Sequence, residues 1–263
     1  MRREARGHVV ALALSVALAV MLGACTNAGS GNVKQESKES EKNEAARVHT
    51  ELGQKYMQQG NLKTALEDLD KALSYDPDYV DAHTVLGVLY ERIGDAKQAE
   101  EHYRRAAQLR PKGGNELNNY GAFLCKVGRY DEAAGYFERA VADPFYQTPE
   151  VALTNSGTCL LKAGKLDPAE TALRSALDHS PNNAEALFQL ASVLYEKGDY
   201  FKARAFMQRF EAVGKPRPES LMLGRNIELR LGNGSAASEY TRRLLQSFPE
   251  SQQARALNEQ NQS

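Results

Sequence analysis

The sequence of 263 residues has no tryptophan, only three cysteines and almost no net charge. Three cysteines are too few for a small fold that a framework of disulfides holds together. Lys and Arg number 33 while Asp and Glu number 34, so the chain lacks the basic surface that nucleic-acid binding requires. Aromatic residues make up 8%, so the core must consist mostly of Leu, Ala, Val and Tyr.

One hydrophobic run stands out, from Val9 to Leu22, directly after a basic start. It falls short of the roughly 20 residues that cross a bilayer, so it indicates an export signal. The segment Leu22-Gly23-Ala24-Cys25 resembles a bacterial lipobox, whose cysteine thiol receives a diacylglycerol. We predict a signal peptide over residues 1–24 and lipid attachment at Cys25. The alternatives are an ordinary cleaved signal with a coincidental cysteine, and twin-arginine export through the N-terminal arginine pair.

The resemblance to lipoproteins implies several acyl chains on the mature N-terminus, and two or more hold a protein stably at a membrane. In such lipoproteins Thr26 after the cysteine, rather than Asp, favours the outer membrane. We therefore expect a chain anchored by lipid in the outer membrane and facing the periplasm. Residues 26–44 contain one large aliphatic residue, Val33, and no aromatic residue, so we predict a flexible tether over residues 25–45.

From residue 46 the sequence repeats itself. Gly60, Gly94, Gly128, Gly164 and Gly198 are spaced 34, 34, 36 and 34 residues apart. A period of about 34 residues is typical of tetratricopeptide repeats, in which each repeat is a pair of helices. Each of these glycines can end a first helix in a left-handed conformation that costs other residues more.

The predicted fold class is therefore all-α, a right-handed superhelical solenoid of about six tetratricopeptide repeats over residues 46–250. Small residues such as Gly53 and Ala65 would let the two helices of a repeat cross closely. The sixth repeat is degraded, with Gly232 off the register of the others, as expected where a stack closes against water. The polar tail, residues 251–263, is either a fraying helix or disordered. The predicted repeats span residues 46–79, 80–113, 114–147, 150–183, 184–216 and 217–250.

The period slips by two residues within segment 141–150, where two prolines bracket Phe145 and Tyr146. We expect an exposed and partly stiff loop there. Either the insertion is neutral, or the two aromatic side chains pack back on the solenoid or touch a partner.

Two cysteines remain once Cys25 is assigned to lipid. Cys125 and Cys159 each lie late in the first helix of a repeat, the third and the fourth. First helices of successive repeats pack side by side, and an exported protein enters an oxidising compartment. We therefore predict a disulfide between these two residues. The alternative is two buried free thiols that behave as small apolar residues.

Motifs of catalysis and metal binding are missing. The sequence has no HExxH, no CxxC, no GxSxG and no P-loop. His49 and His83 lie 34 residues apart at the same position of two repeats, so we interpret them as seam residues rather than as a ligand pair. We expect no enzyme, no metal, no cofactor and no small-molecule substrate.

The remaining function is the binding of another polypeptide. Stacked helix pairs curve, and their first helices line a concave groove. The register places small and mostly neutral side chains in this groove, which suits an extended or helical peptide better than a phosphate or a polyanion. The nine predicted groove residues are Thr84, Val88, Asn115, Asn118, Ala122, Thr154, Thr158, Phe188 and Ser192.

The most specific segments are Leu117-Asn-Asn-Tyr-Gly-Ala-Phe-Leu-Cys125, Asp143-Pro-Phe-Tyr-Gln-Thr-Pro149 and Asn155-Ser-Gly-Thr-Cys159. Together with the lipobox and the repeats, they resemble the type IV pilus biogenesis and stability lipoproteins, or pilotins (the PilF/PilW family). The resemblance covers about residues 22–249.

The resemblance implies a protein that binds the pilus secretin and promotes its outer-membrane localisation or multimerisation, which supports pilus assembly and twitching motility. The alternative is a periplasmic tetratricopeptide scaffold lipoprotein that serves outer-membrane protein assembly or a cell-wall complex. Deletion of the gene separates the two, because only the first function predicts altered secretin multimers.

Overall fold

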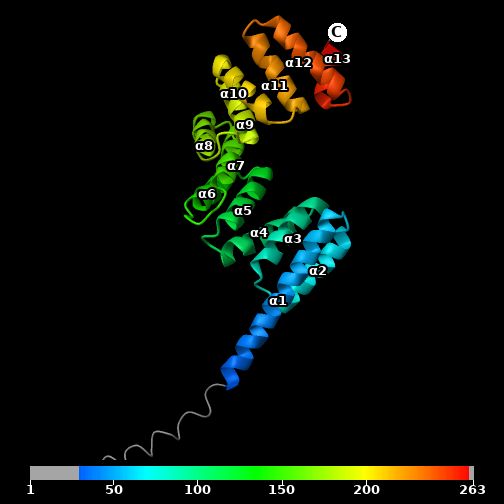
Figure 1. Cartoon of the computed structure of the whole chain (residues 1–263), viewed down its shortest axis with the longest axis vertical. Helices are drawn as coiled ribbons and strands as arrows, with labels where there is room; N and C mark the ends of the chain where they lie inside the picture. The colour runs from blue at the N-terminus through cyan, green and yellow to red at the C-terminus, as the bar shows by residue number, and fades with distance from the viewer. Residues whose placement is uncertain (1–29, 261–263) are drawn as a thin grey trace, which may run out of the picture. The chain divides into compact units, whose positions relative to one another are not determined.

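A computed structural model describes residues 30–260, and these form thirteen helices and no strand (Figure 1). The predicted signal peptide and Cys25 lie outside the described residues. The chain divides into two compact units within α3, between Val85 and Leu86. The helices are α1 (Ser30–Gln58), α2 (Leu62–Tyr75), α3 (Val80–Ile93), α4 (Ala96–Leu109), α5 (Gly114–Lys126), α6 (Tyr130–Val141), α7 (Pro149–Lys162), α8 (Leu166–His179), α9 (Ala184–Glu196), α10 (Tyr200–Val213), α11 (Pro218–Arg230), α12 (Gly234–Ser247) and α13 (Gln252–Gln260).

The helices pair as the repeat period predicts. In the first unit α1 packs along α2, and in the second unit α5 packs on α6, α7 on α8, α9 on α10 and α11 on α12. The first helices of successive repeats also lie side by side, since α5 contacts α7, α7 contacts α9 and α9 contacts α11. The predicted all-α solenoid of tetratricopeptide repeats is confirmed.

Glycine with a positive φ ends the first helix of every pair. The five predicted glycines have φ between +72° and +84°, and Gly232 has φ of +73°. The prediction that Gly232 is off register is therefore wrong. It lies 34 residues after Gly198, and its neighbour Asn233 caps α12 by accepting a hydrogen bond from the Ala236 amide. The sixth repeat keeps the geometry of the others although its sequence has diverged.

A second set of small residues lets the two helices of a repeat approach closely. A Cβ at Gly157 on α7 would lie 2.8 Å from Leu173 Cδ2 and 3.2 Å from the Ala169 carbonyl oxygen on α8. The large side chain of the second helix therefore fills the place that a first-helix side chain would take. The same pairing recurs in other repeats, between Gly53 and Leu69, Gly87 and Tyr103, Gly121 and Phe137, and Gly224 and Tyr240.

The N-terminal boundary differs from the prediction. Helix α1 begins at Ser30, so the flexible tether predicted over residues 25–45 is wrong from Ser30 onward, where the chain is helical. Figure 1 shows this part of α1 extending beyond α2. Residues 40–44 are exposed, so burial does not hold them helical. The segment is rich in Lys, Glu and Gln, which favour helix, and it extends a helix that packing on α2 has already nucleated.

The C-terminal boundary also differs. The predicted polar tail contains α13, which packs on α11 and α12 and buries Ala254 and Leu257 against Leu221 and Leu244. Two apolar residues three positions apart are enough to give this short helix one packed side. The last helix thus covers the apolar end of the sixth repeat. The tail is neither the fraying helix nor the disordered segment that we expected, but a packed helix.

The longer loop between α6 and α7 separates its two aromatic residues. Tyr146 is buried, and its ring lies so close to Gly114 that a Cβ there would clash with it. Phe145 is 82% exposed. Asp143 fixes the loop, because its carboxylate accepts hydrogen bonds from the amides of Gly114 and Phe145 at 3.2 and 3.0 Å. One aromatic side chain therefore packs back on the solenoid and the other points to solvent.

Candidate binding surface

Helices α5 and α7 place the two predicted cysteines next to each other. Cys125 and Cys159 both lie in the last turn or so of their helices, with their Cα atoms 5.7 Å apart and their sulfur atoms joined as a disulfide. Both side chains are buried. The prediction that these residues are neighbours is confirmed, and the bond ties the first helices of two successive repeats together.

The predicted groove residues divide into two sets. Asn115 is exposed, whereas Thr84, Val88, Ala122, Thr158 and Ser192 are half-buried. The other three are buried, and for these three the predicted exposure is corrected: they are Asn118, Thr154 and Phe188. The next repeat covers these side chains, and the register of a single helix does not show how closely the next repeat packs. The nearest open positions are those one turn further along the same helices.

Hydrogen bonds among these residues account for the burial of the polar ones. The Asn155 side-chain amide on α7 donates to Asn118 Oδ1 on α5 at 3.0 Å, which links two repeats. The Thr154 hydroxyl donates to the Glu150 carbonyl oxygen at 2.6 Å, and the Thr158 hydroxyl donates to the Thr154 carbonyl oxygen at 2.8 Å. Buried polar groups are tolerated when they are paired in this way. The hydroxyls therefore donate within their own helix, and side-chain amides join neighbouring repeats, since the Asn183 amide also donates to the Thr154 hydroxyl at 3.4 Å.

Phe188 on α9 is covered by a residue that sequence reasoning missed. The guanidinium carbon of Arg217, just before α11, lies 4.2 Å from the centre of the Phe188 ring. The same guanidinium forms an ion pair with Glu185 at 2.9 Å. The repeat period gave no signal for this contact, because Arg217 has an extended backbone just before α11 and lies outside the helical register. The groove in this region carries an arginine–glutamate ion pair beside an aromatic ring, rather than the uncharged side chains expected.

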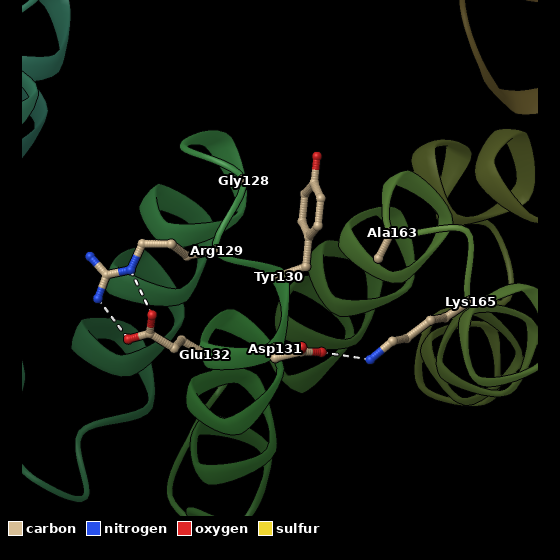
Figure 2. A pocket seen from close by; sticks show the side chains of 7 residues that line it. All are labelled: Gly128, Arg129, Tyr130, Asp131, Glu132, Ala163 and Lys165. Atoms are coloured by element: carbon tan, nitrogen blue, oxygen red, sulfur yellow. Dashed lines mark hydrogen bonds and ion pairs between the residues drawn. The ribbon is translucent and has the colours of Figure 1, made fainter.

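The edge where first and second helices join holds an open cavity of about 330 Å³. Figure 2 shows its charged side chains turned toward each other, Arg129 toward Glu132 and Lys165 toward Asp131, with Tyr130 standing between the pairs. The Arg129–Glu132 and Lys165–Asp131 ion pairs both measure 2.6 Å. The hydrogen bond from Arg129 lowers the pKa of Glu132. The charges of this cavity are compensated internally, so it offers no selectivity for an ion.

Tyrosines form hydrogen bonds to glutamates near the helix crossings. The Tyr103 hydroxyl donates to Glu91 at 2.7 Å, and the Tyr240 hydroxyl donates to Glu211 at 2.9 Å. Burial, together with these carboxylates, raises the pKa of both tyrosines above the ordinary value of 10.0. Burial beside Glu100 raises the pKa of Tyr120 to about 12. These tyrosines stay neutral at physiological pH and act in packing.

The histidines of the first unit have structural partners. His49 lies 3.0 Å from an oxygen of Asp68 and stacks on Tyr75, and the His83 ring nitrogen lies 3.0 Å from the Pro77 carbonyl oxygen. The two histidines are thus held by different groups. Among residues 30–260 no cluster of His, Cys, Asp and Glu has the composition of a metal site. Within the same range, no helix has both the length and the apolar character needed to cross a membrane.

Paired helices, left-handed glycines at their turns and side-by-side first helices define a tetratricopeptide-repeat protein. Tetratricopeptide-repeat models match residues 53–94, 80–112, 117–143 and 160–223. The chain is 31% identical to the type IV pilus assembly protein PilF of Pseudomonas aeruginosa over 240 residues. The aligned region covers 91% of this chain and 94% of that protein. The chain therefore belongs to the PilF/PilW family of type IV pilus biogenesis factors.

Solved structures agree with this assignment. The crystal structure of PilW, described as a widely conserved type IV pilus biogenesis factor, is 31% identical with a TM-score of 0.76, over 81% of this chain and 97% of that one. A structure of Pseudomonas aeruginosa PilF is 29% identical with a TM-score of 0.74, over 83% and 99% of the two chains. The likeness covers the repeats as a whole.

Proposed function

We propose that this protein is a pilotin: a non-enzymatic lipoprotein, anchored by Cys25 in the outer membrane and facing the periplasm, that binds the pilus secretin. By binding the secretin, it would promote secretin localisation and multimerisation in that membrane, and so pilus assembly and twitching motility. The single observation that carries the proposal is the match to PilF over 94% of that protein's length. The lipobox at Leu22–Cys25 supports the anchor.

The anchor and the repeats have complementary roles in this proposal. Lipid at Cys25 confines the chain to the membrane, and the first helices offer the groove residues that remain accessible. Confinement raises the effective concentration of the secretin around this surface, so a modest intrinsic affinity is sufficient. Export also supports oxidation of Cys125 and Cys159, because the periplasm keeps protein thiols oxidised.

The test is deletion of the gene, followed by measurement of secretin multimers in outer-membrane fractions. We expect multimers to be lost on deletion, restored by the wild-type gene, and not restored in the outer membrane by Cys25→Ala. Asn27→Ala, which leaves the lipobox intact, is the matched control and should restore them. Unchanged multimers together with altered outer-membrane barrel proteins would contradict the proposal and support the scaffold alternative.

A further inference from the structure

Arg217 is held in place by two neighbours on α9 and one on α10. Its guanidinium carbon lies 4.2 Å from the Phe188 ring centre and 6.0 Å from the Phe210 ring centre. Its Nη2 atom lies 2.9 Å from Glu185 Oε2. An arginine stacked on aromatic rings has lost much of its freedom before any ligand arrives, so less entropy is lost when it binds one.

The donors of Arg217 are only partly used. A guanidinium has five N–H groups in a fixed fork. Among the described residues, Glu185 is the one carboxylate paired with Arg217, and the Nε atom is buried without an acceptor. The side chain is still 37% exposed, so its outer edge is open to a second anionic group.

Helix α11, which follows Arg217, carries charged side chains of both signs, two arginines and two glutamates. Arg225, two turns after Arg217, donates to Asn226 Oδ1 at 3.1 Å and forms no ion pair among the described residues. The accessible groove residues of repeats three and four, by contrast, are Asn115, Ala122 and Thr158, all neutral. The uncharged groove residues of repeats three and four are therefore followed, between repeat four and repeat six, by a region with charged side chains, among which Arg217 and Arg225 have unused donors.

We propose that Arg217, stacked on Phe188, is a recognition site for a carboxylate on the bound polypeptide. An acidic side chain of the partner would accept hydrogen bonds from the open edge of the guanidinium, while neutral residues of the same segment lie along repeats three and four. Charge-assisted hydrogen bonds from arginine to carboxylate are stronger than neutral ones and have a defined direction. The site thus fixes the register and direction of the segment. This inference rests on the proposed function only for the identity of the partner, the secretin.

The first test captures the secretin with the full-length, lipid-anchored protein from detergent-solubilised membranes. We expect Arg217→Gln to reduce capture about tenfold or more, the loss typical of one charge-assisted hydrogen bond, and Arg217→Lys to reduce it less. Arg242→Gln, which removes an exposed ion pair to Glu239 on α12, is the matched control and should capture as the wild type does. Circular dichroism confirms that each variant is folded.

The second test needs no secretin. The Nε–H signal of Arg217, assigned by its loss in Arg217→Lys, is followed by nuclear magnetic resonance during titration with two synthetic peptides of Leu and Ala that carry either Glu or Gln. We expect the Glu peptide to shift this signal and the Gln peptide to leave it unchanged. Capture of secretin equal in Arg217→Gln and wild type, or no shift with the Glu peptide, overturns the inference. A shift with the Glu peptide but no capture by the wild type instead refutes the secretin as partner and leaves the carboxylate site standing.

Discussion

Removal of the Cys125–Cys159 bond is the perturbation with the largest expected effect on stability. The bond closes a loop of 34 residues, and the loss of chain entropy in the unfolded state gives about 3.8 kcal/mol at 25 °C for a loop of that length. Domains of this kind are stable by about 5–15 kcal/mol in total, so the bond contributes a substantial share. With a urea m-value of about 2–3 kcal/mol/M, the unfolding midpoint should fall by about 1–2 M.

Urea denaturation followed by circular dichroism measures this shift. The change is Cys125→Ala with Cys159→Ala, because alanine leaves an apolar side chain where both sulfur atoms are buried. Each single variant should lose as much stability as the double variant, since either change breaks the same bond. Reductant should shift the wild-type midpoint toward that of the double variant and leave the double variant unaffected.

The reasoning fails if the oxidised wild type and the double variant unfold at the same urea concentration. It fails equally if protein purified from the periplasm without reductant contains two thiols that react with an alkylating agent after denaturation. Either result would favour the alternative of two buried free thiols.

Two further predictions concern packing. Gly157→Ala should destabilise the protein by about 1–3 kcal/mol through overpacking against Leu173. Gly135→Ala should stabilise it by up to about 1 kcal/mol, because this glycine is helical and an added Cβ would meet nothing within 4 Å beyond its own helix. Shifts of the urea midpoint in the same direction for both variants would contradict this. Tyr146→Ala should cost about 2–4 kcal/mol because its ring is buried, and Phe145→Ala should change stability by less than about 0.5 kcal/mol. Thermal melts of the two loop variants check the contrast, and similar melting temperatures would refute the described loop.

The repeating part of the fold could be predicted from the sequence because every repeat needs the same residue types at the same positions. A glycine such as Gly164 with positive φ, or a small residue such as Gly157 beneath Leu173, recurs at a constant interval and so is visible without coordinates. The two ends were predicted less well. At the N-terminus helix propensity extends α1 although residues 40–44 are exposed, and at the C-terminus Ala254 and Leu257 suffice to pack a helix within a polar segment.

The candidate site could be predicted only where it follows from the repeat register. The register identified the neighbouring cysteines correctly, but it placed the buried residues Asn118, Thr154 and Phe188 in the groove. It did not show that Asn118 bonds to Asn155 across two repeats, or that Arg217 covers Phe188. Both contacts depend on how individual side chains are oriented, and the Arg217 contact also depends on the conformation of the chain before α11; no periodic pattern encodes either.

The disulfide and the arginine site are connected through the stack. In a repeat array each repeat contacts only its neighbours, so stability is roughly a sum over repeats and interfaces. The bond joins α5 to α7, and α7 contacts α9, which carries Phe188 and Glu185 under Arg217. Loss of the bond would therefore loosen the support of α9 without touching the arginine itself. A cysteine variant that captures less secretin is thus no evidence that the cysteines contact the partner. The peptide-induced shift of Arg217 distinguishes the two, because it should persist in a cysteine variant that remains folded.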